Sequence, residues 1–591
     1  MEVHVATGPQ IDVWRADLRY EEVAYADART DAERAEFEQL RRDVVADLRA
    51  SGLDQLVPRV DDNLWSLGVH EDVGEGDEGE GRAPARDRDA ERGVRRSSEW
   101  QRMNGALLHD RRAPGGALST GRSRPLRTSG PSVAGSRRSF GLALGAIAVA
   151  GLVVRVAYVL AERRDFVPGG DAYFYHAGAN LLADGKGFIS PFFAADGRTV
   201  PAAEHPPLYL VYLAIPSALG MRSVLAHMLW SCVLGTGTVV LTGLVGRVVG
   251  GARVGLVAAA LAAVYPNLWA PDGMLQAETA STFAATLAVW LAYRYLQRPS
   301  GARLATVGAA CGLGALARSE LLALVPLLVL PLAFARDGRA WRTRARWSAV
   351  AAAAALVVVA PWLALNAVRF EHPVLMSTQI DLLLASANCD TTYFGPFQGY
   401  YDITCATEIA AREGLRDDED QSVAGLVYRR AALEYVGDHL GALPRVVGVR
   451  LLRLAGLHDP GRYARMDAFV EGRDPWVSWS ALYSFYALAV LAACGALVVR
   501  GERRAPLYPL LAPVAMVVAT VAVTYASTRF RAAAEPVLVV LAAVGIDRGA
   551  QLASARWRRA EMASTGGPAP RARPAVSRSA GSARRSASRA P

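Results

Sequence analysis

The sequence FGLALGAIAVAGLVVRVAYVLA (residues 140–161) runs directly into ERRDFVPGGDAYFYH (residues 162–176). The first stretch has a single charged residue, Arg155, and is long enough to cross a bilayer, which takes about 20 apolar residues. The second stretch is charged, aromatic and interrupted by glycines. Because this change from an apolar run to a polar segment recurs as far as about residue 548, we expect an all-α polytopic membrane protein.

The apolar runs predict about ten membrane-spanning helices. We place them at 140–161, 223–246, 253–268, 275–296, 304–317, 320–335, 347–367, 476–499, 506–525 and 534–548. The fifth run is short, so residues 304–335 are alternatively a hairpin that does not cross fully. Residues 206–219 are apolar but only about 14 residues long, which is typical of an interfacial or re-entrant helix.

Both ends of the chain differ from this middle region in composition. We interpret residues 1–138 as a cytoplasmic, largely disordered region, because their second half combines high charge with few apolar residues. Residues 549–591 form a basic cytoplasmic tail that we also expect to be disordered. Residues 139–548 then form the membrane domain. Since the chain opens without an apolar core, we expect no secretory signal peptide, and the first apolar run acts as an uncleaved anchor.

Basic residues cluster in every second connection between the expected spans. The positive-inside rule places these connections in the cytoplasm. We therefore expect a multi-pass protein of the plasma membrane, with cytoplasmic N- and C-termini and with residues 162–222 and 369–475 as long outer loops. A basic tail is also typical of nucleic-acid binding. The flanks of the spans account for the charge, however, so we expect the lipid bilayer as a partner and no nucleic acid.

Three arginines do not follow this charge rule. Arg318, Arg529 and Arg531 lie beside apolar runs on the expected outer side. An arginine at the centre of a bilayer costs on the order of 2.5–3.5 kcal/mol, so a partner must offset this cost. A phosphate is a natural partner, because the planar guanidinium stays charged and matches phosphate oxygens. We predict phosphate binding for all three, with snorkelling to the interface as the alternative for Arg318.

Four short motifs occur in a set order within residues 140–548. They are Asp171 with Glu204-His205-Pro206-Pro207-Leu208-Tyr209, then Gly312-Leu-Gly-Ala-Leu-Ala-Arg318, Pro361-Trp362 with Asn366, and Thr528-Arg529-Phe530-Arg531 with Glu535-Pro536. This ordered set resembles the GT-C glycosyltransferase superfamily. Within it, the set is similar to the dolichyl-phosphate-mannose protein mannosyltransferase and aminoarabinose transferase group, glycosyltransferase family 39 and its relatives. The chain departs from the family pattern in lacking the arginine of the Pro-Trp-x-x-Arg-Asn element.

The resemblance implies a GT-C-like helical bundle and a sugar transfer on the outer face. The donor would be a polyprenyl-phosphate sugar, of mannose or arabinose, and the acceptor a glycan, lipid or protein. A single displacement that inverts the anomeric centre needs one general base, and Asp171 is the expected base. Arg318, Arg529 and Arg531 would bind the donor phosphate. Further residues are expected to contact substrate or support the site: Tyr173, His176, Glu204, His205, Glu278 and Glu320.

Each of these residues also has a structural interpretation. Asp171 is a suitable N-cap for a helix that starts at the next residue. Glu204 and His205 fit a surface turn before two prolines, and Glu320 fits an ion pair with Arg318. His176 could bind a divalent ion together with Asp171 and Glu204, although a lone histidine is a weak signal for a metal. The sequence leaves the metal requirement open.

Two cysteines lie in the second outer loop. Cys389 and Cys405 flank a polar segment, and the outer face is oxidising, so we predict a disulfide. In the chain-entropy model, a bridge of this span contributes about 3 kcal/mol. The alternative is two free thiols. The segment between them carries aromatic residues that would form either a sugar-stacking surface or the core of the loop: Tyr393, Phe394, Phe397, Tyr400 and Tyr401.

A different class of function also needs an anion site within the membrane. A transporter or flippase of a lipid-linked saccharide would bind the same phosphate. Transporters tend to show internal repeats and helices broken at the midplane, and the sequence shows neither clearly. The long outer loops and the acidic motif of the first one favour the glycosyltransferase.

Overall fold

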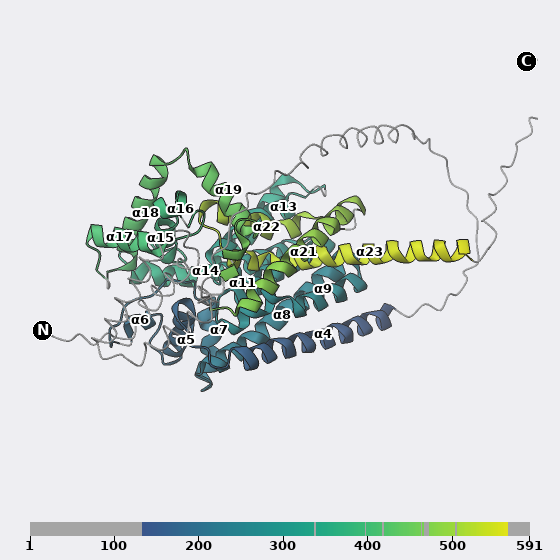
Figure 1. The fold of residues 1–591 in the computed structure, drawn as a ribbon, viewed down its shortest axis with the longest axis horizontal. Coiled ribbons are helices and arrows are strands. Elements are labelled where there is room, and N and C mark those ends of the chain that lie inside the picture. Colours follow the sequence, from purple (N-terminus) through teal and green to yellow (C-terminus); the bar gives the residue numbers. More distant parts are fainter. Residues whose placement is uncertain are drawn as a thin grey trace, which may run out of the picture. The chain divides into compact units, whose positions relative to one another are not determined.

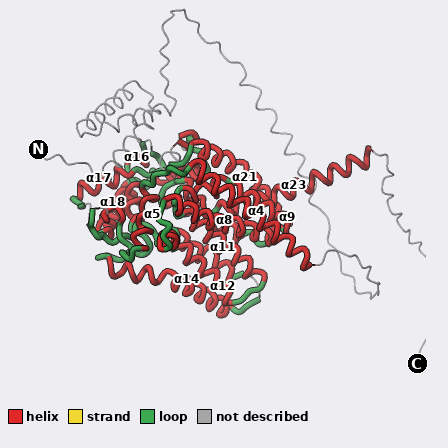
Figure 2. The backbone as a smooth tube through the Cα atoms, turned by 90° about the horizontal axis from the view of Figure 1, so that it is seen from below, coloured by secondary structure: helices red, strands yellow, loops and turns green. Residues whose placement is uncertain are grey.

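Helices account for the regular structure throughout the described part of the chain. The structure, a computed structural model, describes residues 133–564 apart from 195, 336–337, 396, 417–418, 463, 466–471 and 503–504. Within these residues, helices are joined by loops (Figure 2), and Ile189 pairs with Pro201 in an isolated antiparallel bridge. The predicted all-α class is confirmed for this part of the chain. Most of the two ends for which we predict disorder, 1–132 and 565–591, lies outside the described residues.

Among the residues that the structure describes, five helices are long and apolar enough to cross a membrane. They are α4 (Val133–Glu162), α8 (Val224–Gly250), α14 (Trp341–Arg369), α21 (Pro475–Glu502) and α23 (Glu535–Ser564). A sixth candidate consists of α9 (Ala252–Val264) and the segment Pro266–Gly273, which contains α10 (Pro266–Trp269) and η2 (Ala270–Gly273) and is bent by 74° from α9. These lengths and compositions define a multi-pass membrane protein.

The predicted count of ten spans is not confirmed. The other expected spans correspond to shorter or more polar elements: α11 (Glu278–Gln297), α12 (Gly301–Ala315), η3 (Ser319–Ala323), the π-helix η4 (Val325–Val329), α13 (Leu330–Ala333) and α22 (Tyr508–Val523). Pro326 and Pro331 lie in the broken stretch, where each removes a backbone donor that a continuous helix needs. Helix α11 is continuous, but Glu278 and several hydroxyl side chains make it less apolar than the five long helices.

The predicted boundary after residue 548 falls inside a helix. Helix α23 continues to Ser564, so residues 549–564, assigned to a disordered tail, are helical. This extension contains alanines, arginines and a leucine, which have high helix propensity even without an apolar face. The composition of the chain changes from apolar to polar within α23, but the helical backbone continues through this change.

The two long segments between spans contain helices of their own (Figure 1). The first holds α5 (Gly170–Ala183), α6 (Pro191–Ala194) and α7 (Leu208–Ala218). The second holds α15 (Gln379–Ser386), α16 (Asp390–Tyr393), α17 (Ile403–Glu413), α18 (Gln421–Asp438) and α19 (Leu443–Leu454). The short α7 matches the apolar stretch 206–219, whose length predicts a helix that does not span.

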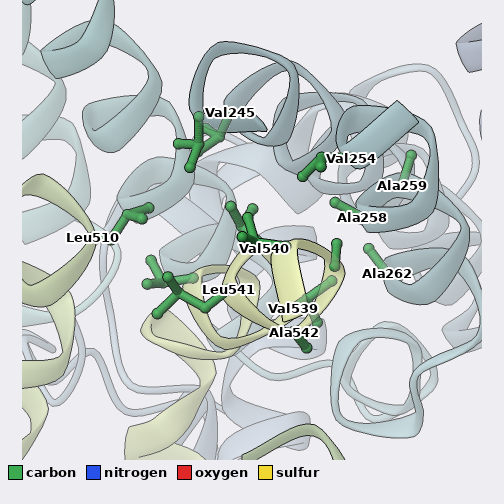
Figure 3. Packing of buried hydrophobic residues seen from close by; sticks show 14 of the residues in the cluster. Val245, Val254, Ala258, Ala259, Ala262, Leu510, Val539, Val540, Leu541 and Ala542 are labelled. Carbon is green, nitrogen blue, oxygen red and sulfur yellow. The ribbon is translucent and has the colours of Figure 1, made fainter. Parts of the chain in front are cut away.

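Small side chains allow the helices of the membrane part to pack closely. Helices α8, α9 and α23 lie side by side (Figure 1). Figure 3 shows Ala258 and Ala262 of α9 next to Val539 and Val540 of α23, all of them buried. Alanines four residues apart present a flat helix surface, and association inside a membrane relies on this kind of van der Waals packing.

Glycines bring α21 and α23 even closer together. A Cβ atom added to Gly495 of α21 would lie 1.9 Å from the carbonyl oxygen of Leu541 in α23. Added to Gly545 of α23, it would lie 2.5 Å from the carbonyl oxygen of Leu491 in α21. A neighbour that is backbone cannot rotate away, so both positions require glycine.

Replacement of Gly495 by alanine is therefore expected to lower the free energy of unfolding by about 1–3 kcal/mol, as overpacking does. The measurement is thermal unfolding of the purified protein in detergent. Gly501→Ala is the matched control, because Gly501 lies in the same helix and nothing lies within 4 Å of an added Cβ. Equal midpoints for the two variants would contradict the close contact.

An ion pair buried inside the bundle joins α4 to the bent segment after α9. Arg155 donates from Nε to Asp272 Oδ2 at 2.9 Å, and both side chains are at most 1% exposed. The guanidinium also donates to the carbonyl oxygens of Gly151 and Leu268, and Thr279 donates to the other carboxylate oxygen. The charged residue inside the first apolar run is thus paired internally, and it does not snorkel.

Candidate active site

Asp171 lies in the first turn of α5 and does not cap it. The N-cap is Gly169, which makes no side-chain cap bond, and Gly170 adopts a φ of +49° that favours glycine. The Asp171 carboxylate faces other segments. Its Oδ1 lies 3.2 Å from His205 Nε2, and its Oδ2 accepts a hydrogen bond of 2.8 Å from Arg529 Nη2. Asp171 therefore joins the first outer segment to the connection before the last helix.

Glu278 connects the arginines of the site. It is the first residue of α11, and its side chain is 2% exposed. Its Oε1 accepts from Arg529 Nε at 2.7 Å and from Arg318 Nη1 at 2.5 Å. A carboxylate at a helix N-terminus is also favoured by the helix dipole. Two arginines separated by more than two hundred residues in the chain thus share one buried carboxylate.

Arg318 is held on two further sides. Its Nε donates to Glu320 Oε1 at 2.6 Å, and the ring of Phe530 lies 5.1 Å from the guanidinium carbon. Arg318 follows α12 with an extended backbone, and η3 begins at the next residue. Its Nη2 makes no hydrogen bond to any described residue, and the side chain is 19% exposed. Arg318 therefore keeps N–H donors that a bound anion could use.

Arg531 lies apart from this cluster. It donates from Nε to Glu535 at 3.1 Å and from Nη1 to the Leu454 carbonyl at 2.9 Å, and it packs over Phe485. Residues 528–533 form the 3₁₀-helix η5 (Thr528–Ala533). With about three residues per turn, side chains two positions apart point in different directions. Arg529 and Arg531 therefore do not converge on one point, although the sequence predicts that both bind the donor phosphate.

Two small pockets adjoin the cluster and share part of their lining. One is lined by Glu278, Arg529 and Glu535 among others, and the second by Arg531. Both are lined by Asn267, Arg473 and Thr528. Asn267 and Arg473 are absent from our predicted site residues. The sequence could have identified Arg473 in the same way as the other arginines, because it also lies beside a span on the expected outer side.

Aromatic rings hold His205 against Asp171. The imidazole stacks on Tyr175, with ring centroids 5.0 Å apart and planes at 28°. It also makes an edge-to-face contact with Phe174, with ring centroids 5.1 Å apart. Tyr175 follows Asp171 by four residues in α5, so both lie on one face of the helix. That helical spacing could have identified Tyr175 from the sequence, but our prediction names only Tyr173.

The remaining predicted residues of the first outer segment point elsewhere. Tyr173 contacts Phe192, with ring centroids 5.4 Å apart. His176 Nδ1 lies 3.2 Å from His227 Nδ1 of α8. These two side chains support the packing of α5, and neither forms a hydrogen bond, ion pair or ring contact with the described residues of the charged cluster.

Glu204 contacts the segment 369–475 and does not contact Asp171. Its Oε1 accepts from Gln421 Nε2 at 2.7 Å, at the start of α18. Burial raises the pKa of the Glu204 carboxyl above its ordinary value. The structure therefore places Glu204 between the segments 162–222 and 369–475.

The expected metal set is not assembled. Among the described residues, no group of three or more His, Cys, Asp or Glu side chains is placed to hold a metal ion, so Asp171, His176 and Glu204 do not form one.

The electrostatics of the cluster keep Asp171 ionised. Burial acts to raise the pKa of its carboxyl, but the neighbouring His205 and Arg529 side chains, which both contact it, outweigh burial and lower the pKa. Around Asp171, the carboxylates of Glu278 and Glu320 and the guanidinium groups of Arg318 and Arg529 alternate in sign. Such an arrangement can hold an anionic ligand at its arginines and a hydroxyl group near its carboxylate.

Cys389 and Cys405 are joined by a disulfide in the structure. The bridge connects α16 to α17. The aromatic residues between them are mostly buried, as at Tyr393, Phe397 and Tyr400, whereas Phe394 is exposed. They form the interior of this segment more than an open surface for a sugar.

Comparison with known proteins finds a family match over the middle part of the chain. Residues 204–365 match the sequence model of the family described as dolichyl-phosphate-mannose-protein mannosyltransferase. The matched residues include Glu204, His205, Glu278, Arg318 and Glu320. This match confirms the resemblance predicted from the sequence. No curated protein matches the chain.

Solved structures of two membrane enzymes show a distant likeness. One is the archaeal oligosaccharyltransferase AglB from Archaeoglobus fulgidus in complex with an inhibitory peptide and a dolichol-phosphate, with 14% identity, a TM-score of 0.43, and coverage of 74% of this chain and 53% of that chain. The other is ArnT from Cupriavidus metallidurans bound to undecaprenyl phosphate, with 16% identity, a TM-score of 0.35, and coverage of 70% of this chain and 78% of that chain. The chain thus spans about half the length of the oligosaccharyltransferase.

Proposed function

We propose that this chain is a membrane glycosyltransferase that uses a polyprenyl-phosphate sugar as its donor. The observation that carries the proposal is the cluster in which Asp171, Glu278, Arg318 and Arg529 meet, although they come from four separate segments. The family match over residues 204–365 supports the same class. Ionisable groups held beside membrane helices are costly, which favours a role in binding or chemistry.

The geometry supports a division of labour within the cluster. Arg318 and Arg529 bind the donor phosphate. Asp171 takes part in removing the proton from the acceptor hydroxyl. The acceptor oxygen forms a bond to the anomeric carbon while the bond from that carbon to the phosphate oxygen breaks. The anomeric centre is inverted, and polyprenyl phosphate leaves. Arg531 lines the neighbouring pocket and has a supporting role.

We extend the proposal to the sugar, the acceptor, the side of the membrane and the domain organisation. The sugar is mannose or arabinose, and the acceptor is a glycan, a lipid or a protein. The reaction takes place at the outer face of the plasma membrane, with both termini in the cytoplasm. Residues 139–548 form the catalytic membrane domain, flanked by the polar regions 1–138 and 549–591. The requirement for a divalent metal ion is open, so the assay is run both with a divalent ion and with a chelator.

The test is an assay of the purified full chain in lipid nanodiscs with radiolabelled polyprenyl-phosphate sugars. The panel contains mannose and arabinose donors, offered with and without membrane acceptors and with either a divalent ion or a chelator. Transfer to an acceptor is the expected result, with slow sugar release when no acceptor is present. Binding without transfer, together with movement of the intact donor across proteoliposomes, would replace the transferase with a flippase.

Replacement of Arg318 by lysine is expected to weaken donor binding about tenfold. Lysine keeps the charge near Glu278 and Glu320 but lacks the planar fork of donors that matches a phosphate. The tenfold estimate corresponds to the loss of one charge-assisted hydrogen bond, which contributes about 1.5–3 kcal/mol. The measurement is the donor KM beside kcat at saturating donor.

Arg303→Lys is the matched control for this change. Arg303 donates to the Arg298 carbonyl and lies on the surface, outside the cluster. An unchanged donor KM in the Arg318 variant would remove Arg318 from the phosphate site.

A further inference from the structure

His205 has the geometry of an oriented base. Its Nε2 lies 3.2 Å from Asp171 Oδ1, and its ring is stacked on Tyr175. Two prolines follow it directly, so the backbone after it is restricted. His205 Nδ1 makes no hydrogen bond to any residue that the structure describes. The imidazole is therefore fixed on one side and available on the other.

The partner on the fixed side decides the tautomer. An ionised carboxylate only accepts hydrogen bonds, so the nitrogen that faces Asp171 must carry the proton. In a neutral imidazole the other nitrogen then has a lone pair. That nitrogen is Nδ1, the one without a partner among the described residues. Asp171 thus sets both the orientation and the protonation of the ring.

Asp171 itself is poorly placed to take a proton. Both of its oxygens are engaged, one by His205 and the other by Arg529. The same contacts lower the pKa of its carboxyl, and a carboxyl with a low pKa is a weak base. Histidine is the side chain whose ordinary titration falls between pH 5 and 8.

The charged and titratable groups around the imidazole come from several segments. Asp171 and Tyr175 of α5 contact it, and Glu204 precedes it in the chain. Arg529 of η5 reaches it through Asp171, and Glu278 and Arg318 act electrostatically on Tyr175, on which the imidazole stacks. Asp171 is the charged side chain that contacts the ring directly.

We infer that His205, oriented by Asp171, is the group that removes the proton from the acceptor hydroxyl. This inference rests on the proposed function and deepens it, since it names the catalytic base and makes Asp171 a positioning residue. The acceptor O–H proton moves to Nδ1 as the oxygen bonds to the anomeric carbon. The electron pair of the breaking carbon–oxygen bond leaves with the polyprenyl phosphate. The imidazolium that forms is stabilised by the Asp171 carboxylate.

His205→Gln is the first test variant. Glutamine retains an amide that can donate to Asp171, but it cannot take up a proton at neutral pH. We expect kcat to fall about 10²–10⁴-fold, the usual contribution of general base catalysis, with the donor KM almost unchanged. We also expect the wild-type rate to fall as the pH is lowered from 8 to 5, and this acid limb to be absent from the variant.

His205→Ala tests the same role by chemical rescue. Added imidazole is expected to restore part of the rate, more strongly at a pH at which free imidazole is neutral. A residue that only supports the fold would not produce a rescue that follows the protonation of the added base. His458→Gln is the control, because His458 lies outside the charged cluster, and it should keep both the rate and the acid limb.

The outcomes separate this inference from the proposed function. If the wild-type chain transfers sugar, and His205→Gln keeps its rate and its acid limb, the inference is wrong and Asp171 is the remaining candidate for the base. If the wild-type chain neither transfers nor releases sugar from any donor of the panel, the proposed function fails first. Loss of rate with an intact acid limb and no rescue would mean that His205 has only a structural role.

Discussion

Replacement of Asp171 by asparagine is expected to reduce sugar transfer by about 10²–10⁴-fold while the protein still folds. Asparagine keeps the shape of the side chain but removes its negative charge. The ion pair with Arg529 is lost, and the amide can present a donor to His205 where the carboxylate can only accept. An imidazole oriented by a carboxylate is disabled by such a change, because the wrong tautomer becomes favoured. The measurement is kcat at saturating donor and acceptor.

This expectation holds whether Asp171 accepts the proton itself or positions His205. Asp184→Asn is the matched control, since Asp184 ends the same helix and pairs with Arg222 on the surface. Thermal unfolding of both variants separates a loss of chemistry from a loss of fold. Full transfer activity in the Asp171 variant would remove this aspartate from the site.

Replacement of Asp272 by asparagine is expected to lower the free energy of unfolding by about 3–5 kcal/mol. The change leaves the Arg155 guanidinium inside the bundle without its carboxylate, and neither side chain reaches solvent. The pocket cannot readily rearrange, because a Cβ atom at Gly235 would lie 2.1 Å from the Asp272 carboxylate, so the helix backbone packs directly against it. Thermal unfolding in detergent measures the loss.

The double variant Arg155→Met with Asp272→Asn provides the control. It removes the unpaired charge together with its partner, and paired removal of a buried ion pair is often close to neutral. The double variant should therefore be more stable than Asp272→Asn alone. An Asp272→Asn variant as stable as the wild type, or a double variant less stable than Asp272→Asn alone, would contradict the interpretation of the pair as a charge-compensated contact.

The membrane class of the fold and the members of the charged cluster could be predicted from the sequence. Long apolar runs identify α4, α8, α14, α21 and α23, because hydropathy depends on composition over a whole helix. Arg318 and Arg529 were visible because each violates a charge rule that applies to individual residues. The structure places both against Glu278, which the sequence had marked only as an unusual acidic residue at the end of a helix.

The partners within the site could not be predicted in the same way. Arg529 and Arg531 look equivalent in the sequence, and only the 3₁₀ turn between them directs one to Asp171 and the other to Glu535. Glu204 is positioned by a hydrogen bond from Gln421, and these two residues come together only in the folded chain. Such contacts depend on tertiary packing across hundreds of residues, and no local pattern encodes them.

The predicted count of ten spans is not confirmed for a related reason. Residues 304–335 are apolar but are divided among α12, η3, η4 and α13, and residues 506–525 correspond to the single short helix α22. Apolar composition reports burial, and burial in lipid and burial between helices favour the same residues. Residues 369–475, expected as a loop, contain the helices α15 to α19 among the described residues.

The bond between Asp171 and Arg529 also has a consequence for biosynthesis. The two residues are 358 positions apart. At about 5–20 residues per second, a ribosome would add Arg529 roughly 20–70 s after Asp171. Through that interval the aspartate has no guanidinium to neutralise it, and Glu278 has only Arg318. A nascent chain that stops before residue 529 would therefore enter the membrane without the ion pair between Asp171 and Arg529, so the charged cluster is completed only after Arg529 has been added.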